Sequence, residues 1–117
     1  MPPGDVRDRI ELTGAQLAAV LDDVRGTCQA GQRLAPSAGE DLPGGRDGLL
    51  LDAHRALARA ATLAAQAGET VMLAVMTLRS EHPEEAARLA DAAGRTVGQV
   101  ADQVRRAGEL VRSAEQH

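Results

Sequence analysis

A stripe of mainly apolar residues runs through positions 50–78 of this chain at alternating steps of four and three, and no step is skipped. Its members are Leu50, His54, Leu57, Ala61, Ala64, Gly68, Val71, Val75 and Leu78. This spacing lines one face of an α-helix and is typical of a helix that packs on another helix. It predicts one helix over residues 47–80, capped by Asp47. Gly68 costs a helix about 1 kcal/mol relative to Ala, so a break there, giving four helices, is the alternative.

A second stripe of the same spacing predicts a helix over residues 83–116. It consists of Ala86, Ala90, Ala93, Val97, Val100, Val104, Ala107, Val111 and Ala114. Pro83 ends the preceding helix and suits the first turn of the next one, with His82 as its cap. Because the turn is short, the two helices must be antiparallel. Gly94 and Gly98 lie beside the stripe, and we expect them to let a neighbouring backbone approach closely.

The region before residue 34 predicts a shorter helix over residues 13–32. Thr13 and Gln16 match a capping box, and Leu12 and Leu17 are spaced as a hydrophobic staple. Residues 1–12 then form a lead-in, although Val6 and Ile10 leave a backward extension of the helix open. The core-facing positions of this helix would be Leu17, Leu21, Val24 and Cys28. Residues 34–46 hold two prolines and three glycines and predict a flexible loop.

Together these segments predict an all-α protein of one domain, residues 1–117. A long antiparallel hairpin with coiled-coil-like packing would carry a shorter N-terminal helix, making a three-helix bundle. Residues 47–67 have a second apolar stripe beside the first, so this helix should be central. That stripe is Leu49, Ala53, Ala56, Ala60, Leu63 and Ala67. The chain has no aromatic residues, and a core of Ala, Leu and Val removes little area from water, so oligomerisation would help stability.

Composition and charge argue against several functions. The net charge is −4 with acids and bases interspersed, so no basic stripe suits nucleic acid. Thirteen Arg without any Lys indicate the codon usage of a GC-rich genome. No apolar run of about 20 residues predicts a membrane span. The N-terminus lacks a secretory signal, which favours the cytoplasm but leaves signal-less export open.

The most informative surface is the far end of the hairpin. A first helix of about 28 Å covers only half of the second helix, which leaves an apolar surface there. It comprises Val71, Met72, Leu73, Met76 and Leu89. Such a surface predicts self-association or the binding of a partner helix. The alternative is that residues 5–12 shield part of it.

His54 is the alternative functional centre, for phosphotransfer or for a small ligand inside the bundle. Histidine-containing phosphotransfer domains are helical bundles of similar size with the phosphorylated His on a long helix. They have a basic residue three positions after the His, where this chain has Leu57. Phosphotransfer also needs an exposed His, whereas the heptad phase predicts that His54 points inwards. Cys28 is expected to be a small buried residue.

No spacing of His, Cys and carboxylates predicts a metal site, and no nucleophile lies beside a base in a recognisable pattern. The sequence therefore predicts no catalytic residue and no cofactor, and favours a protein that is not an enzyme.

The segment Ile10-Glu11-Leu12-Thr13 resembles the start of the helical-hairpin proteins exported by type VII secretion systems, in which an extended apolar pair precedes a capped helix. That resemblance implies an antiparallel, dimeric, exported protein without a signal peptide. The chain departs from the family in lacking a Trp-x-Gly turn. Its C-terminal Val111-Arg112-Ser113-Ala114-Glu115 lacks the aromatic residue of the export signal.

Overall fold

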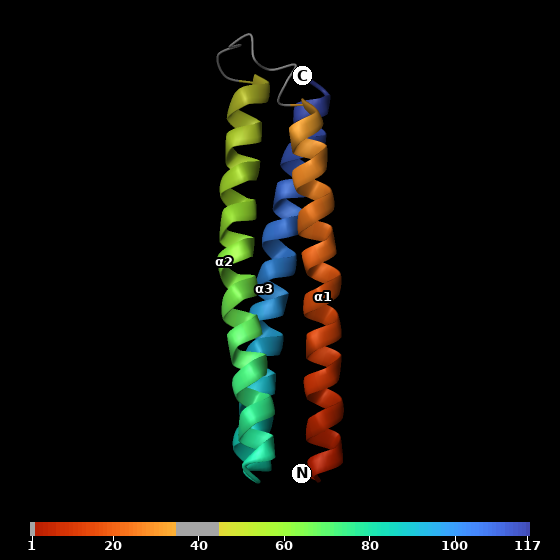
Figure 1. The fold of residues 1–117 in the computed structure, drawn as a ribbon. Helices are drawn as coiled ribbons and strands as arrows, with labels where there is room; N and C mark the ends of the chain where they lie inside the picture. Colours follow the sequence, from red (N-terminus) through yellow and green to blue (C-terminus); the bar gives the residue numbers. More distant parts are fainter. Residues whose placement is uncertain (1, 35–44) are drawn as a thin grey trace.

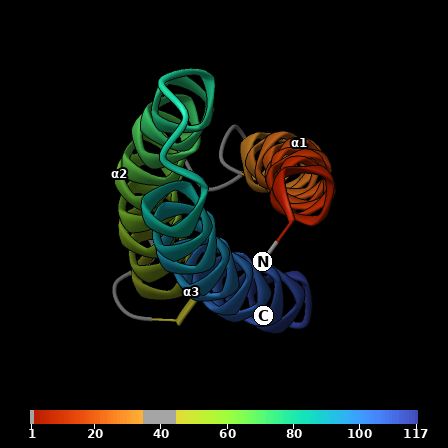
Figure 2. The ribbon, with the colours of Figure 1, turned by 90° about the horizontal axis from the view of Figure 1, so that it is seen from below.

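Three long helices make up the part of the chain, residues 2–34 and 45–117, that the computed structural model describes. They are α1 (Pro3–Leu34), α2 (Gly45–Arg79) and α3 (Pro83–Glu115). All three run the length of a rod of 58 × 16 × 16 Å. The N-terminus and the α2–α3 turn lie at one end, and the C-terminus lies at the other (Figure 1). Seen along the rod, α1 stands beside the α2–α3 pair as the third member of a bundle (Figure 2).

The predicted all-α three-helix bundle is confirmed, and α2 continues through Gly68 without a break. Because α2 begins at Gly45, Asp47 lies in its first turn instead of capping it. Of the loop predicted over residues 34–46, Leu34 belongs to α1, and Gly45 and Arg46 belong to α2. The rest of that loop lies outside the described residues.

The predicted start of the first helix at Thr13 is wrong, because α1 begins at Pro3 and has 32 residues. Thr13 is a buried residue inside the helix, and its hydroxyl donates to the backbone oxygen of Arg9 at 2.9 Å instead of capping a first turn. Leu12 is exposed, so the staple does not form. The extended apolar pair implied by the type VII resemblance is likewise helical.

Long-range packing explains this difference. The side of α1 that faces the bundle carries residues at alternating steps of four and three, all buried or half-buried: Val6, Ile10, Thr13, Leu17, Val20 and Val24. Burying Val6 and Ile10 outweighs the local capping signal, since most helix stability in proteins comes from tertiary packing. Leu21, which was predicted to face the core, is exposed.

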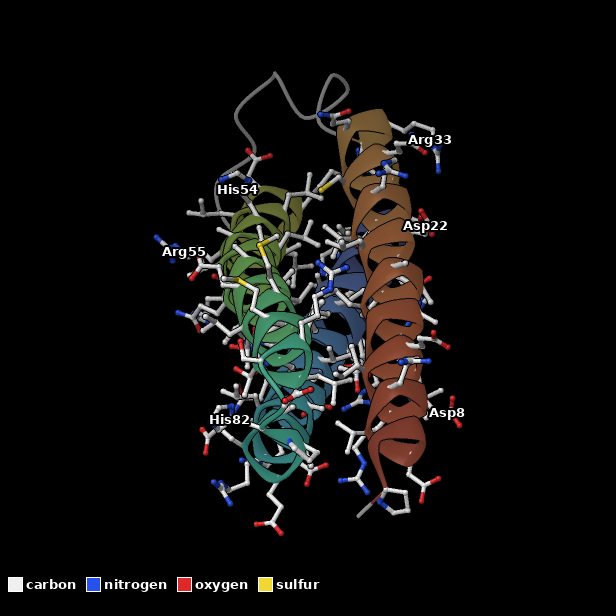
Figure 3. The ribbon with its side chains drawn as sticks, turned by 60° about the horizontal axis from the view of Figure 1, so that its bottom comes forward. Asp8, Asp22, Arg33, His54, Arg55 and His82 are labelled. Carbon is white, nitrogen blue, oxygen red and sulfur yellow. The ribbon has the colours of Figure 1, made fainter. Side chains whose placement is uncertain are left out.

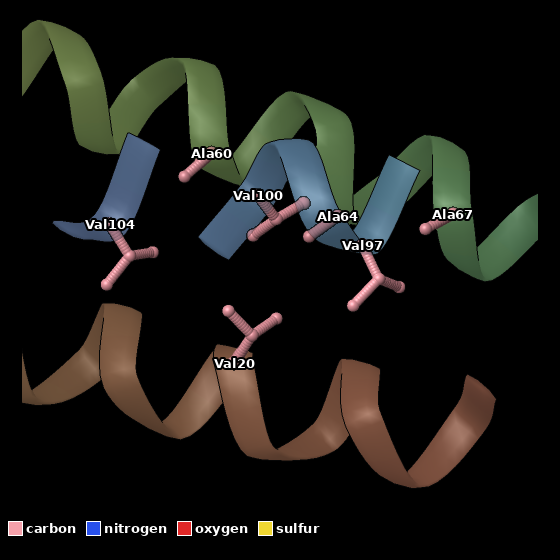
Figure 4. Packing of buried hydrophobic residues seen from close by; sticks show 7 residues of the cluster. All are labelled: Val20, Ala60, Ala64, Ala67, Val97, Val100 and Val104. Atoms are coloured by element: carbon pink, nitrogen blue, oxygen red, sulfur yellow. The ribbon is translucent and has the colours of Figure 1, made fainter. Parts of the chain in front are cut away.

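The core consists of three clusters stacked along the rod. The middle cluster joins all three helices through Val20, Ala60, Ala64, Ala67, Val97, Val100 and Val104 (Figure 4). Every one of the nine positions predicted for the stripe of α3 is buried. For α3, the sequence pattern therefore identified the inner face correctly.

The buried face of α2 differs from the first stripe described in the sequence, the one over positions 50–78. Its fully buried residues are all alanines: Ala53, Ala56, Ala60, Ala64, Ala67 and Ala74. Most of them belong to the second stripe or continue its spacing, because α2 packs most extensively against α3 and presents that face to it. The first stripe is turned towards α1, so Leu57 and Val75 are half-buried while His54 and Ala61 are exposed.

The turn between α2 and α3 is closed by two backbone hydrogen bonds. The amide of His82 donates to Thr77 at 3.1 Å, and the amide of Glu81 donates to Leu78 at 3.0 Å. This is a Schellman motif, whose left-handed position is filled by Glu81 with φ 65°. His82 is the N-cap residue of α3, as predicted, but its side chain makes no capping hydrogen bond.

Side-chain hydrogen bonds and an ion pair also connect the helices. At the C-terminal end of α3, the guanidinium of Arg46 donates to the backbone oxygens of Ala114 and His117 at 3.3 Å each. A cation is favourable there because the last carbonyls of a helix carry partial negative charge. Near the other end, Arg9 of α1 pairs with Asp91 of α3 at 2.9 Å.

The glycines of α3 do not mediate a close helix contact, contrary to expectation. Nothing lies within 4 Å of the position that a Cβ atom would take at Gly94 or Gly98. The Gly-x-x-x-Gly spacing therefore does not draw a neighbouring backbone close within the bundle.

Candidate interaction surface

Three large apolar side chains of α2 remain exposed close to the α2–α3 turn. Their exposed fractions are 65% for Met72, 52% for Leu73 and 57% for Met76. They lie on two consecutive turns of one helix, so they form a continuous patch, called here the tip surface. Sequence reasoning identified all three of these residues.

The other two predicted surface residues lie elsewhere. Val71 and Leu89 are half-buried and pack against a cluster that contains Val6 and Ile10. They are covered because α1 extends to this end of the bundle, as the alternative involving residues 5–12 foresaw. The predicted surface is therefore divided, and only its part on the outer side of α2 is open.

The tip surface continues along α2 as a longer stripe that the sequence reading missed. Its members are exposed and recur at alternating steps of four and three. This outer stripe is Leu51, Arg55, Ala58, Thr62, Ala65, Glu69, Met72 and Met76. The available signal was the sevenfold spacing of Leu51, Ala58, Ala65 and Met72, which was hidden because two other apolar stripes lie on the same helix. Figure 2 shows that neither α1 nor α3 lies over the side of α2 turned away from them.

The middle of the outer stripe is shallow, small and low in polarity. Ala58, Arg59, Thr62 and Leu63 line a slight depression there. The Thr62 hydroxyl donates to the backbone oxygen of Ala58 at 3.2 Å. Since that hydroxyl already has a partner within the helix, covering Thr62 would leave its side chain without an unpaired donor. Arg59, which also lines the depression, is exposed, and its guanidinium would need water or an acceptor from the partner.

Charged residues flank this middle section. Arg55 lies 3.6 Å from Asp52 in an exposed pair within the helix. Glu69 makes no ion pair with any residue that the structure describes. The outer stripe itself therefore carries one cation, in an exposed pair with Asp52, and one anion, and Arg59 is a further exposed cation beside its middle.

Contrary to the expectation that no segment is apolar enough for a membrane span, α2 has the length and composition to cross a membrane, and it is the single such helix among residues 2–34 and 45–117. Only 17% of its most apolar window is buried in the bundle. The core helix of a soluble protein, which is mostly buried, can have the same length and apolar composition. The low burial of α2 shows instead how much of its apolar surface faces outwards.

His54 is exposed, which corrects the prediction that it points inwards. It lies with Arg55 in the end of the bundle away from His82 (Figure 3). His54 and the half-buried Cys28 line the same hollow between α1 and α2, of about 300 Å³, together with apolar residues such as Leu50 and Leu57. The structure thus brings together two residues that the sequence had treated separately.

Within the described ranges, no three His, Cys, Asp or Glu side chains are grouped so that they could hold a metal ion. Comparison with known proteins gives no family model that matches the chain, and no significant match to a curated protein or a solved structure. The functional argument therefore depends on the surface itself.

Proposed function

We propose that this protein is a non-enzymatic helical interaction module, which uses the tip surface of α2 to bind a helix of a second copy or of a partner protein. One observation carries the proposal. Met72, Leu73 and Met76 are each more than half exposed, on a helix whose fully buried residues are all alanines. These three large apolar side chains thus contribute little to the fold of the bundle, whereas Leu57, Leu63 and Leu78 of the same helix pack against the core clusters.

The physical argument is the free energy of covering this surface. Fully burying a Leu or Met side chain is worth about 1.5–3 kcal/mol, so covering the exposed parts of three would contribute about 3 kcal/mol. Single exposed apolar residues are ordinary on soluble proteins, but a contiguous patch is typical of an interaction site. Methionine suits such a surface because its flexible side chain adapts to a partner.

The test is sedimentation of purified protein over a wide concentration range, followed by refractive optics because the chain has no aromatic absorbance. Leu73→Glu should abolish association and leave the far-UV circular dichroism spectrum unchanged. Leu12→Glu is the matched control, because Leu12 is equally exposed but lies on α1. Association that persists unchanged in Leu73→Glu would contradict the proposal.

A partner of another kind is tested in cells by placing a photo-cross-linking residue at position 73 or, as control, at position 12. The proposal expects a discrete adduct from position 73 that disappears when Met76→Glu is added. Absence of an adduct from position 73, together with a purified protein that is monomeric, would overturn the proposed function.

A second candidate, phosphotransfer or small-ligand binding centred on His54, is favoured by the exposure of this side chain at the apolar hollow that Cys28 also lines. Incubation with a small phosphodonor, followed by intact-mass measurement of the wild type and of His54→Ala, tests phosphotransfer. A phosphate adduct found in the wild type alone would support this candidate over the interaction module. No mass difference would eliminate phosphotransfer.

A further inference from the structure

The outer stripe of α2 has a pattern that is complementary to itself when reversed. Arg55 lies seven residues before Thr62, and Glu69 lies seven residues after it. Leu51 lies eleven residues before Thr62, and Leu73 lies eleven residues after it. A second copy of α2, laid antiparallel with a twofold axis at Thr62, therefore sets Arg55 level with the partner's Glu69, and Leu51 level with the partner's Leu73, which lies beside the outer stripe in the tip surface.

We propose that the partner of this surface is a second copy of the chain, which docks α2 against α2 in antiparallel orientation with the twofold axis at Thr62. This inference rests on the proposed function and names its partner. Arg55 of each protomer pairs with the partner's Glu69, and Leu51 of each protomer packs on the partner's Met72 and the partner's Leu73. Each contact occurs twice, as a closed twofold interface requires.

Small residues at the centre allow the two helices to approach. Ala58, Thr62 and Ala65 are the members of the outer stripe around the axis, and the exposed Arg59 and Gln66 lie beside them, with Arg59 at the shallow depression. Because the Thr62 hydroxyl already donates within its own helix, covering Thr62 leaves this hydroxyl paired. The larger members of the outer stripe lie towards its two ends, where they meet the opposite end of the partner, and the long side chain of Arg59 lies at the flank of the axis.

Other arrangements lose the charge pairing. A parallel dimer sets Arg55 against the partner's Arg55 and Glu69 against the partner's Glu69, and like charges in contact are unfavourable. Moving the antiparallel axis by half a heptad in either direction puts Arg55 opposite the partner's Met76 or the partner's Thr62. A bilayer is also a poor match, since it would have to cover the charged Arg55–Asp52 pair and Glu69, which has no ion pair with any described residue.

The size of the contact predicts a dissociable dimer. From Leu51 to Met76 the stripe spans about 37 Å, and a helix-wide contact of that length covers about 400 Å² on each protomer. Stable interfaces cover about 800 Å² on each partner. We therefore expect a dissociation constant of about 10 μM or weaker.

Charge reversal in the full chain tests the orientation. Arg55→Glu puts like charges together at two symmetry-related places, as does Glu69→Arg, and each variant should weaken dimerisation at least about tenfold. The double variant Arg55→Glu/Glu69→Arg should restore the wild-type constant. An equimolar mixture of the two single variants should also dimerise, since both pairs are then complementary. Sedimentation from about 5 to about 500 μM covers the range expected from the contact area, with circular dichroism as the folding control.

The possible negative results distinguish a wrong register, a wrong partner and a wrong proposed function. If Leu73→Glu abolishes association but neither charge reversal changes it, the antiparallel register is overturned and the interaction module stands. If the wild type remains monomeric throughout, the second copy is overturned, and cross-linking from position 73 decides on the proposed function. Binding of the monomeric wild type to vesicles of mixed zwitterionic and anionic lipid, lost in Leu73→Glu, would also overturn the second copy in favour of a membrane surface.

Discussion

The helices α2 and α3 have nearly equal lengths but distribute their apolar residues in opposite ways. The buried residues of α3 include Val97, Val100, Val104 and Val111, and its outward positions are rich in Arg, Asp and Glu. On α2 the fully buried residues are alanines, and the larger Leu51, Met72, Leu73 and Met76 are about half exposed or more. Thus α3 buries its valines in the bundle, whereas α2 keeps four of its larger apolar side chains at the surface, although Leu57, Leu63 and Leu78 pack against the core clusters. A helix can therefore pack in the core through small residues and still expose several of its large apolar side chains.

The strongest test of this difference places the same charge on the buried face and on the exposed face of α2 and compares the loss of stability. Ala60 is fully buried in the middle cluster, and Ala58 is exposed on the outer stripe. We expect Ala60→Glu to lower the free energy of unfolding by about 4 kcal/mol or more, because an unpaired carboxylate would lie in the core. Ala58→Glu should change it by less than about 0.5 kcal/mol.

Urea unfolding followed by far-UV circular dichroism measures both changes, at a protein concentration low enough for the chain to be monomeric. Equal losses in the two variants would mean that the outer face of α2 is buried within the folded monomer, and the distinction between its two faces would fail.

A smaller effect compares the two helices directly. Val100 of α3 is fully buried, whereas Leu73 of α2 is 52% exposed although it is the larger side chain. We expect Val100→Ala to cost about 2 kcal/mol of unfolding free energy, through lost burial and the cavity that remains. Leu73→Ala should cost less than about 0.5 kcal/mol in the monomer. The same urea titration measures which of the two variants loses more unfolding free energy. A larger loss for Leu73→Ala than for Val100→Ala would reverse the roles assigned to the two helices.

The same contrast explains which parts of the fold the sequence could predict. The helix α3 has one apolar stripe, so its inner face was identified at all nine positions. The bounds of α2 were predicted almost correctly, but it has several apolar stripes. Only its packing against α3 selects the face of Ala53 and Ala60 over that of His54.

The errors at α1 and at the site have one common cause. A local capping signal at Thr13 competed with the burial of Val6 and Ile10, which depends on residues distant in the sequence. Once α1 reaches the end of the bundle, Val71 and Leu89 are covered, and only the outer part of the predicted surface stays open. Met72 and Met76 are exposed as predicted, although the prediction assumed a first helix too short to reach them and α1 has 32 residues.

The smallest expected effect concerns the junction of α2 and α3. Glu81 occupies the left-handed position of the Schellman motif, with φ 65°, where a side chain is unfavourable and Gly is usual. We expect Glu81→Gly to raise the unfolding free energy by about 1 kcal/mol and the melting temperature by about 4 °C. Ser80→Gly is the matched control. Ser80 has a negative φ and its hydroxyl donates to the Met76 backbone oxygen at 3.0 Å, so this change should stabilise nothing. Thermal unfolding followed by circular dichroism compares the variants, and equal melting temperatures would show that the turn does not restrain the hairpin through Glu81.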